Sequence, residues 1–149
     1  MAPALTSLLG LLVALLLLLP GAGTAGASLL HLEGPVPGDL GVRQGHLAPC
    51  PSPAHCAREV WPVSDPSAAL AALLPAVLSL DGVELVETGD DYIHATATSR
   101  LFGFVDDLEV HADAGAGVLE VRSVSRLGDS DLGVNARRLA TLRRSLPGG

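Results

Sequence analysis

The fold of this chain is decided by residues 83–125, which read VELVETGDDYIHATATSRLFGFVDDLEVHADAGAGVLEVRSVS. Runs rich in Val, Ile, Thr and Tyr alternate here with Gly and Asp clusters, which is typical of short strands joined by tight turns. The strands that we expect are Val83–Thr88, Tyr92–Arg100, Phe104–Ala112 and Val118–Ser125. Because the connections between them are short, consecutive strands should pair as an antiparallel meander.

A helix is predicted on each side of this meander. Asp65-Pro66 supplies an N-cap acceptor followed by proline at the first helical position. Pro75 predicts that this helix ends near Leu73, because proline disrupts a helix interior. A last helix is expected over residues 135–145. The predicted fold class is therefore α+β: an antiparallel meander sheet of about four strands, with an N-terminal and a C-terminal helix on one face.

Size and charge limit the possible functions. The chain has 149 residues, of which 48% are hydrophobic, so it is long enough for one core and short for two domains. Its formal net charge of -7 argues against nucleic acid as a partner, since phosphate neutralisation needs a basic surface. The sequence contains no phosphate-binding loop, dinucleotide fingerprint or HExxH motif. We therefore expect no cofactor and no metal site.

The N-terminus reads as a targeting segment. Leu8–Leu19 is an uninterrupted apolar run, and Ala25-Gly26-Ala27 has the small-x-small pattern of a signal-peptidase site. Residues 1–27 are predicted to be a signal peptide or an N-terminal anchor, the latter formed by residues 4–22. Residues 28–44 are predicted to be a flexible linker, and residues 45–146 a single globular domain. The domain should then lie outside the cytoplasm and meet a membrane only through the N-terminal segment.

The two cysteines, Cys50 and Cys56, are close together in a segment rich in Pro and Ser. In an exported chain this spacing favours a disulfide bond. The alternative interpretations are a zinc site in which His46 and His55 join the two thiolates, and a free or redox-active pair.

Strand alternation divides the charged residues between the two faces of the sheet. Arg100 and Arg122 are predicted to lie near Asp107 and Glu109 on the open face. One interpretation is a set of cross-strand ion pairs. The other is an anion-binding surface, in which these arginines and Arg126 present planar guanidinium groups to a carboxylate or phosphate.

Asp106 is the exception, because alternation places its carboxylate on the side where the helices should pack. It would accept backbone N–H bonds at the bend after Gly103, or pair with Arg126. Alternatively, its carboxylate would act as a general acid or base. The loop Gly128–Asp131 has two interpretations as well: a weak match to a calcium-binding loop, or turn formation and capping before the last helix.

Three blocks of the sequence together resemble the domain-of-unknown-function family number 1499. The blocks are Leu47–Cys56, Tyr92–Asp107 and Arg122–Asn135, in the family's order. The resemblance extends over residues 45–142. It implies a small envelope-associated domain with no established activity.

Two hypotheses on function follow. The first is a non-catalytic binding module for an anionic small molecule, a lipid headgroup or an envelope protein. The residues predicted to bind the ligand are Arg100, Asp106, Asp107, Arg122, Arg126, Asp131 and Asn135. The second is a hydrolase-like acid–base enzyme that uses Asp106 or Asp107 with Arg100 and Arg126.

Overall fold

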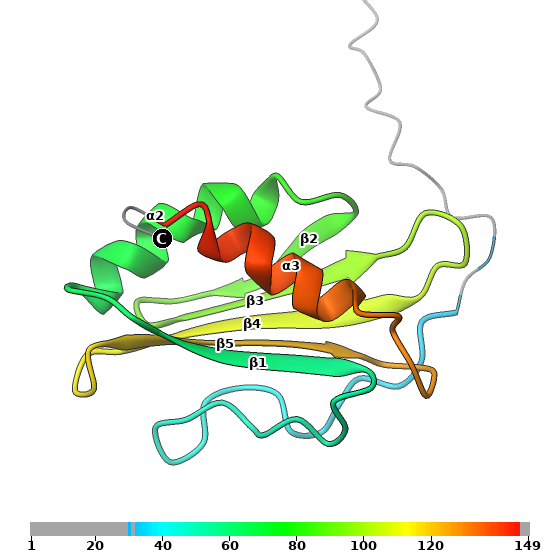
Figure 1. The fold of residues 1–149 in the computed structure, drawn as a ribbon, viewed down its shortest axis with the longest axis horizontal. Coiled ribbons are helices and arrows are strands. Elements are labelled where there is room, and N and C mark those ends of the chain that lie inside the picture. The colour runs from blue at the N-terminus through cyan, green and yellow to red at the C-terminus, as the bar shows by residue number, and fades with distance from the viewer. Residues whose placement is uncertain (1–29, 31, 147–149) are drawn as a thin grey trace, which may run out of the picture.

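The computed structural model describes residues 30 and 32–146 of the chain (Figure 1). In chain order the elements are β1 (Cys56–Pro62), α2 (Pro66–Leu78), β2 (Val83–Thr88), β3 (Tyr92–Thr98), β4 (Val105–Asp113), β5 (Val118–Ser125) and α3 (Val134–Arg143). The signal peptide or anchor predicted for residues 1–27 lies outside the described residues. Among the helices of the described part, none has the length and apolar character needed to cross a membrane.

The strands form an antiparallel sheet in the order β1-β5-β4-β3-β2. Pairing of β2 with β3, β3 with β4 and β4 with β5 confirms the predicted meander. The predicted number of four strands is wrong, because β1 pairs with β5 from Cys56↔Val124 to Pro62↔Val118. The first helix therefore follows a strand instead of preceding the sheet. β1 reads CAREVWP, in which adjacent charges interrupt any apolar alternation, so its pattern alone does not indicate a strand.

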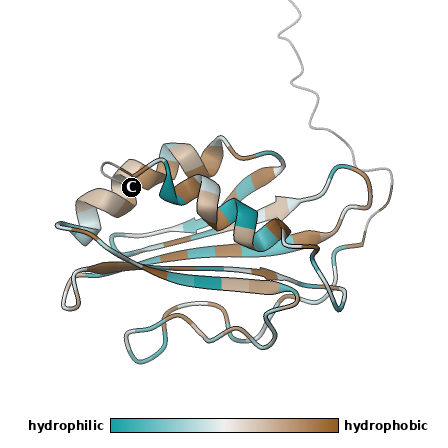
Figure 2. Cartoon of the chain, viewed as in Figure 1, coloured by the Kyte–Doolittle hydropathy of each residue, from teal (hydrophilic) through white to brown (hydrophobic). Residues whose placement is uncertain are grey.

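Both helices cover the same face of the sheet, as predicted (Figure 1). Apolar residues from every strand except β2 and from both helices form the core there, and Figure 2 shows them alternating with polar residues along the strands. The largest fully buried side chains among these are Trp61, Leu73, Val77, Ile93, Leu108, Val110, Leu119, Val121, Leu139 and Leu142. Each such burial stabilises the fold by about 1.5–3 kcal/mol.

Helix α2 begins as predicted and ends later than predicted. The Asp65 carboxylate accepts a hydrogen bond from the Ala68 N–H at 3.0 Å, so Asp65 is the N-cap. The expected end near Leu73 is wrong, because the helix continues through Pro75 to Leu78. Ala71 and Pro75 are both exposed, so water can hydrate the carbonyl that the proline leaves without a donor. Val77, fully buried after the proline, holds the last turn against the sheet.

The opposite face of the sheet is covered by residues 32–55, which we call the strap (Figure 1). Residues 32–44 lie within the predicted linker, and among them Asp39 and Gly41 contact the sheet. Asp39 pairs with Arg122 at 2.8 Å, and the Gly41 N–H donates to a Glu109 carboxylate oxygen at 2.7 Å. The linker prediction misses these contacts because their partners lie far away in sequence.

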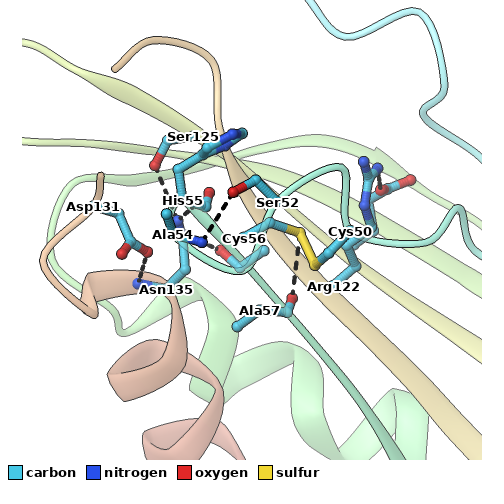
Figure 3. The surroundings of a disulfide bond; sticks show 12 residues. Cys50, Ser52, Ala54, His55, Cys56, Ala57, Arg122, Ser125, Asp131 and Asn135 are labelled. Carbon is cyan, nitrogen blue, oxygen red and sulfur yellow. Dashed lines mark hydrogen bonds and ion pairs between the residues drawn. A yellow bond between two sulfur atoms is a disulfide. The ribbon is translucent and has the colours of Figure 1, made fainter. Parts of the chain in front are cut away.

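The strap ends in the predicted disulfide bond between Cys50 and Cys56, which confirms that interpretation (Figure 3). Because both thiols are consumed, the alternative zinc site with His46 and His55 does not form. Directly before Cys56, the His55 carbonyl accepts hydrogen bonds from the Ser125 N–H at 2.9 Å and from the Asn135 side chain at 3.2 Å. The disulfide thus attaches the strap where β1, β5 and α3 meet.

Replacing both cysteines, as in Cys50→Ser with Cys56→Ser, should lower the free energy of unfolding by about 2 kcal/mol. The short loop, with a sequence separation of 6, restricts the unfolded chain by that amount in the loop-closure account. Urea unfolding without reductant measures the difference. A reductant should produce the same loss in the native chain and none in the variant, and equal stability of the native chain and the variant without reductant would contradict the prediction.

Candidate functional site

The structure contains two polar regions on opposite faces of the sheet. The first lies under the strap and consists of buried side chains from β3, β4 and β5. We call it the charged layer, and its members are Tyr92, His94, Asp107, Glu109, Glu120 and Arg122. Sheet register brings several of them into one row, because Arg122 lies opposite Glu109 and Glu109 lies opposite His94.

Asp107 is a fully enclosed carboxylate of the charged layer, as is Glu109, with no exposed side-chain surface. Arg126 donates to both of its oxygens at 2.8 Å, and the His94 ring lies 2.8 Å from one of them. Burial raises the pKa of Asp107, but the hydrogen bonds from Arg126 and His94 outweigh it, so the pKa lies below its ordinary value. A carboxylate held in its charged form in this way is a poor proton donor near neutral pH.

Glu109 connects β3, β5 and the strap. It accepts hydrogen bonds from the Tyr92 hydroxyl at 2.7 Å, from Arg122 at 2.9 Å and from the Gly41 N–H. Arg122, whose side chain is 1% exposed, uses its second terminal nitrogen for Asp39. Burial, together with the neighbouring Glu109 carboxylate, raises the pKa of Tyr92, so the phenol stays protonated and donates.

Glu120 forms a second set of contacts with the strap. Its oxygens accept from the Leu47 N–H at 2.7 Å and pair with His46 at 2.9 Å and with Arg58 at 3.0 Å. Burial raises the pKa of Glu120, whereas the Leu47 N–H, His46 and Arg58 lower it, and the net pKa is below the ordinary value. The charged layer is thus a set of ion pairs and hydrogen bonds that attaches the strap, although the buried Arg122 Nε has no hydrogen-bond partner.

The prediction of an open sheet face carrying Arg100 and Arg122 is therefore wrong in two respects. The face is buried, and Arg100 does not lie on it. Cross-strand pairing of Arg122 with Glu109 is confirmed, but the pair is buried because the strap covers it. Arg100 lies beyond the end of β3, where Ser99 closes a turn by accepting from the Gly103 N–H and donating to the Phe104 carbonyl. It consequently lies apart from the charged layer.

The second polar region lies on the helix face, at the end of the sheet where β3 and β5 end. Asp106 points to this face, as alternation predicted, and pairs with Arg138 of α3 at 2.8 Å. The predicted pairing of Asp106 with Arg126 is wrong, because Arg126 lies on the strap side with Asp107. Arg138 also donates to the Ser123 hydroxyl at 2.8 Å, and Ser123 donates to Asn135 at 2.6 Å. Asp106 and Asn135 thereby fix the position of the Arg138 guanidinium group.

An open groove of about 330 Å³ adjoins this cluster, between α3 and the connection from β3 to β4. We call it the α3 groove. Its polar lining comprises Asp81, Thr98, Ser99, Arg100, Asp106, Arg137, Arg138 and Thr141. Three arginines and two carboxylates leave a local excess of positive charge, although the whole chain is acidic.

Asp131 lies in the loop before α3 and accepts hydrogen bonds from the start of that helix. Its carboxylate oxygens accept from the Gly133 N–H at 2.7 Å and the Asn135 N–H at 3.0 Å. Burial raises the pKa of Asp131, but these backbone donors outweigh it and lower the pKa below its ordinary value. The capping interpretation of this loop is thus confirmed, and both carboxylate oxygens are engaged with backbone donors.

Of the seven residues predicted to bind a ligand, the α3 groove and the cluster beside it bring together Arg100, Asp106 and Asn135. Asp107, Arg122 and Arg126 lie on the strap side. Sequence reasoning missed Arg137 and Arg138. Asn135, Arg138 and Leu142 follow helical spacing, so they share one face of the last helix. The leucines expected on the inner face of that helix therefore indicate that the Arg138 side chain also points inward.

A family model described as a protein of unknown function (DUF1499) matches residues 46–146. The chain belongs to this family. No curated protein matches the chain. The DUF1499 match covers all seven elements and the α3 groove, whereas Asp39 and Gly41, the first strap residues that contact the charged layer, precede it.

The variant Asp107→Asn should lose about 3–5 kcal/mol of the free energy of unfolding at pH 7, because it leaves Arg126 and His94 without a buried carboxylate. The folded-state pKa of Asp107 is lowered, so its stabilisation is present above the ordinary pKa of 3.8 and is lost as the pH falls through the folded value. Urea unfolding measured from pH 7 downward should therefore show the gap to the native chain closing below about pH 4.

Glu84→Gln is the matched control, because Glu84 is an exposed carboxylate on β2. It should change stability by no more than about 0.5 kcal/mol. A gap between Asp107→Asn and the native chain that stays constant with pH would contradict the assignment.

Proposed function

We propose that this domain is a non-catalytic module that binds an anionic ligand in the α3 groove. The observation that carries the proposal is the convergence of Arg100, Arg137 and Arg138 on one open cavity. Guanidinium groups match the planar, bidentate geometry of carboxylate and phosphate oxygens.

The three arginines differ in how firmly they are held. Arg138 is fixed by Asp106 and Ser123, which makes it a preorganised charge at the floor of the groove. Arg100 pairs with Asp81 at 3.2 Å, but both side chains are largely exposed, so the pair contributes little and an incoming anion can compete for Arg100. Arg137 donates to the Leu132 carbonyl at 2.9 Å from an equally exposed position. Two adjustable arginines beside one fixed arginine suit an anion that arrives from solvent.

The size and lining of the groove indicate the ligand class. A cavity of about 330 Å³ accommodates a small anion with one or two charged groups. The hydroxyl groups of Thr98, Ser99 and Thr141 add donors and acceptors around the arginines. We therefore propose an organic carboxylate or a phosphate-bearing group as the ligand.

The arrangement supports binding more than acid–base catalysis. Asp107 and Arg126 lie across the sheet from Arg100, so the enzyme hypothesis loses the combination of these three residues. Asp106 is ion-paired with Arg138 at 2.8 Å, which engages its carboxylate. The alternative enzyme would need Asp106 free of Arg138.

An extracytoplasmic location belongs to the same proposal. The disulfide bond supports it, because such bonds persist in oxidising compartments. The apolar run Leu8–Leu19 supports it from the sequence side.

Replacing both exposed arginines, as in Arg100→Gln with Arg137→Gln, should weaken the binding of inorganic phosphate and of citrate by about tenfold or more. Hydrogen bonds to charged groups contribute about 1.5–3 kcal/mol each, and 1.4 kcal/mol corresponds to tenfold. Isothermal titration calorimetry at fixed ionic strength measures both affinities, and circular dichroism verifies the fold.

Arg43→Gln provides the control, because Arg43 is an exposed arginine on the strap. It removes the same charge and should leave both affinities unchanged. If the native chain binds neither anion, or if the double variant and Arg43→Gln behave alike, the α3 groove is not an anion site.

A further inference from the structure

One end of the domain exposes a group of large apolar side chains that the core does not use. They come from the β3–β4 connection and from the β5–α3 connection. We call this group the apolar tip, and its members are Leu101, Phe102, Phe104, Leu127 and Leu132. Both phenylalanines of the chain belong to it. Exposed apolar groups of this kind mark interaction surfaces more often than chance accounts for them.

Leu132 is the clearest member of the apolar tip. It is 83% exposed, and its backbone has φ 52, in the left-handed region that favours Gly or Asn. Folding therefore neither buries this side chain nor benefits from it at this backbone position. Phe102 and Phe104 contact each other, with ring centroids 5.7 Å apart, yet both remain open to solvent. An external partner is the simplest use for such side chains.

The described chain enters the domain beside the apolar tip. A Cβ atom at Gly34 would lie 2.5 Å from the Leu127 side chain, so residue 34 packs against the β5–α3 connection. Figure 1 shows both connections and the first strap residues at the same end of the sheet. The described chain therefore begins at this end of the sheet, and the apolar run Leu8–Leu19 precedes it in the sequence.

The two ends of the sheet differ in their charged residues: the connections at the tip carry Arg100 and Arg126 together with Asp129 and Asp131, and α3 adds Arg137. The α3 groove adjoins the apolar tip, because Ser99 and Arg100 precede Leu101 and because Val134 lines the groove shortly after Leu132. At the far end, the β2–β3 and β4–β5 turns carry Asp90, Asp91 and Asp113, and the Asp91 carbonyl accepts from the Ala112 N–H. A negatively charged surface would thus meet arginines at the tip end and only carboxylates in the two turns at the far end.

We propose that the apolar tip docks onto the surface of an anionic lipid bilayer, with the phosphate groups of lipid headgroups in the α3 groove. The apolar side chains enter the boundary between headgroups and acyl chains, while Arg100 and Arg137 meet the phosphates. This inference rests on the proposed function for its phosphate contacts. An apolar run in the sequence before the described chain, which begins at this same end, favours a bilayer over a soluble partner.

Hydrogen exchange of the full chain, followed by mass spectrometry, tests the proposal. Vesicles of phosphatidylcholine with phosphatidylglycerol should slow exchange in residues 99–104 and 126–134, but not in the acidic turns at 89–91 and 113–117. Vesicles of phosphatidylcholine alone should give weaker protection of the tip. Because exchange is read segment by segment, membrane binding by residues 1–29 alone does not imitate this pattern.

The variant Phe102→Ser with Leu132→Ser should lose the protection at the tip while its affinity for inorganic phosphate stays at the native value. Val60→Ser is the matched control, because Val60 is 45% exposed on β1 and Phe102 is 46% exposed. It should retain both properties. Arg100→Gln with Arg137→Gln should lose phosphate binding and the preference for phosphatidylglycerol together.

Other outcomes overturn the inference in distinguishable ways. Native phosphate binding without any vesicle-dependent protection of the tip would overturn membrane docking and leave the proposed function intact. Tip protection that rises with protein concentration, and not with vesicles, would assign the apolar tip to a second copy of the chain. Because both lipids carry a phosphate group and only phosphatidylglycerol has a net negative charge, equal protection by both kinds of vesicle would overturn the preference for an anionic bilayer.

Discussion

The hydrogen bonds and ion pairs of Glu109 hold the strap against the sheet. This carboxylate, on the central strand β4, accepts from Tyr92 on β3, from Arg122 on β5 and from the Gly41 N–H of the strap. Burying such a charge destabilises the folded state unless all of its partners are present. The buried charges of the sheet therefore require the strap in its observed position. Arg122 extends the constraint to Asp39, and Glu120 repeats it with Leu47. The polar face of an ordinary antiparallel sheet thereby becomes a second interior.

The strap is also connected to the helix face of the sheet, through the Cys50–Cys56 disulfide bond and through His55. Cys56 begins β1, and the His55 carbonyl accepts from Asn135, which in turn holds Arg138. The strap, β1 and the α3 groove are therefore connected by short, direct contacts. This connection places one fixed guanidinium group, that of Arg138, in a groove whose other arginines remain adjustable, and the proposed anion site depends on that arrangement.

The meander was predictable because its signals are local. Strands β2 and β5 have the expected bounds, since alternation and turn residues act over a few positions. The capping roles of Asp65 and Asp131 and the disulfide pairing were readable for the same reason. The end of α2 was not, because burial of Val77 outweighs the local effect of Pro75. Strand β1 escaped prediction because its partner, β5, lies some 60 residues away and its own pattern is weak.

The sequence by itself determined which side of each strand a residue occupies. Alternation placed Asp106 on the helix side, and Asp107, Glu109 and Arg122 together on the other, because the side-chain period of a strand is two wherever the strand lies. Only the tertiary structure decided what those sides face. The strap converted an expected surface into buried pairs, and α3 brought Arg137 and Arg138 to Arg100. Contacts between segments distant along the chain depend on the packing of whole elements, and no local pattern of residues encodes that packing.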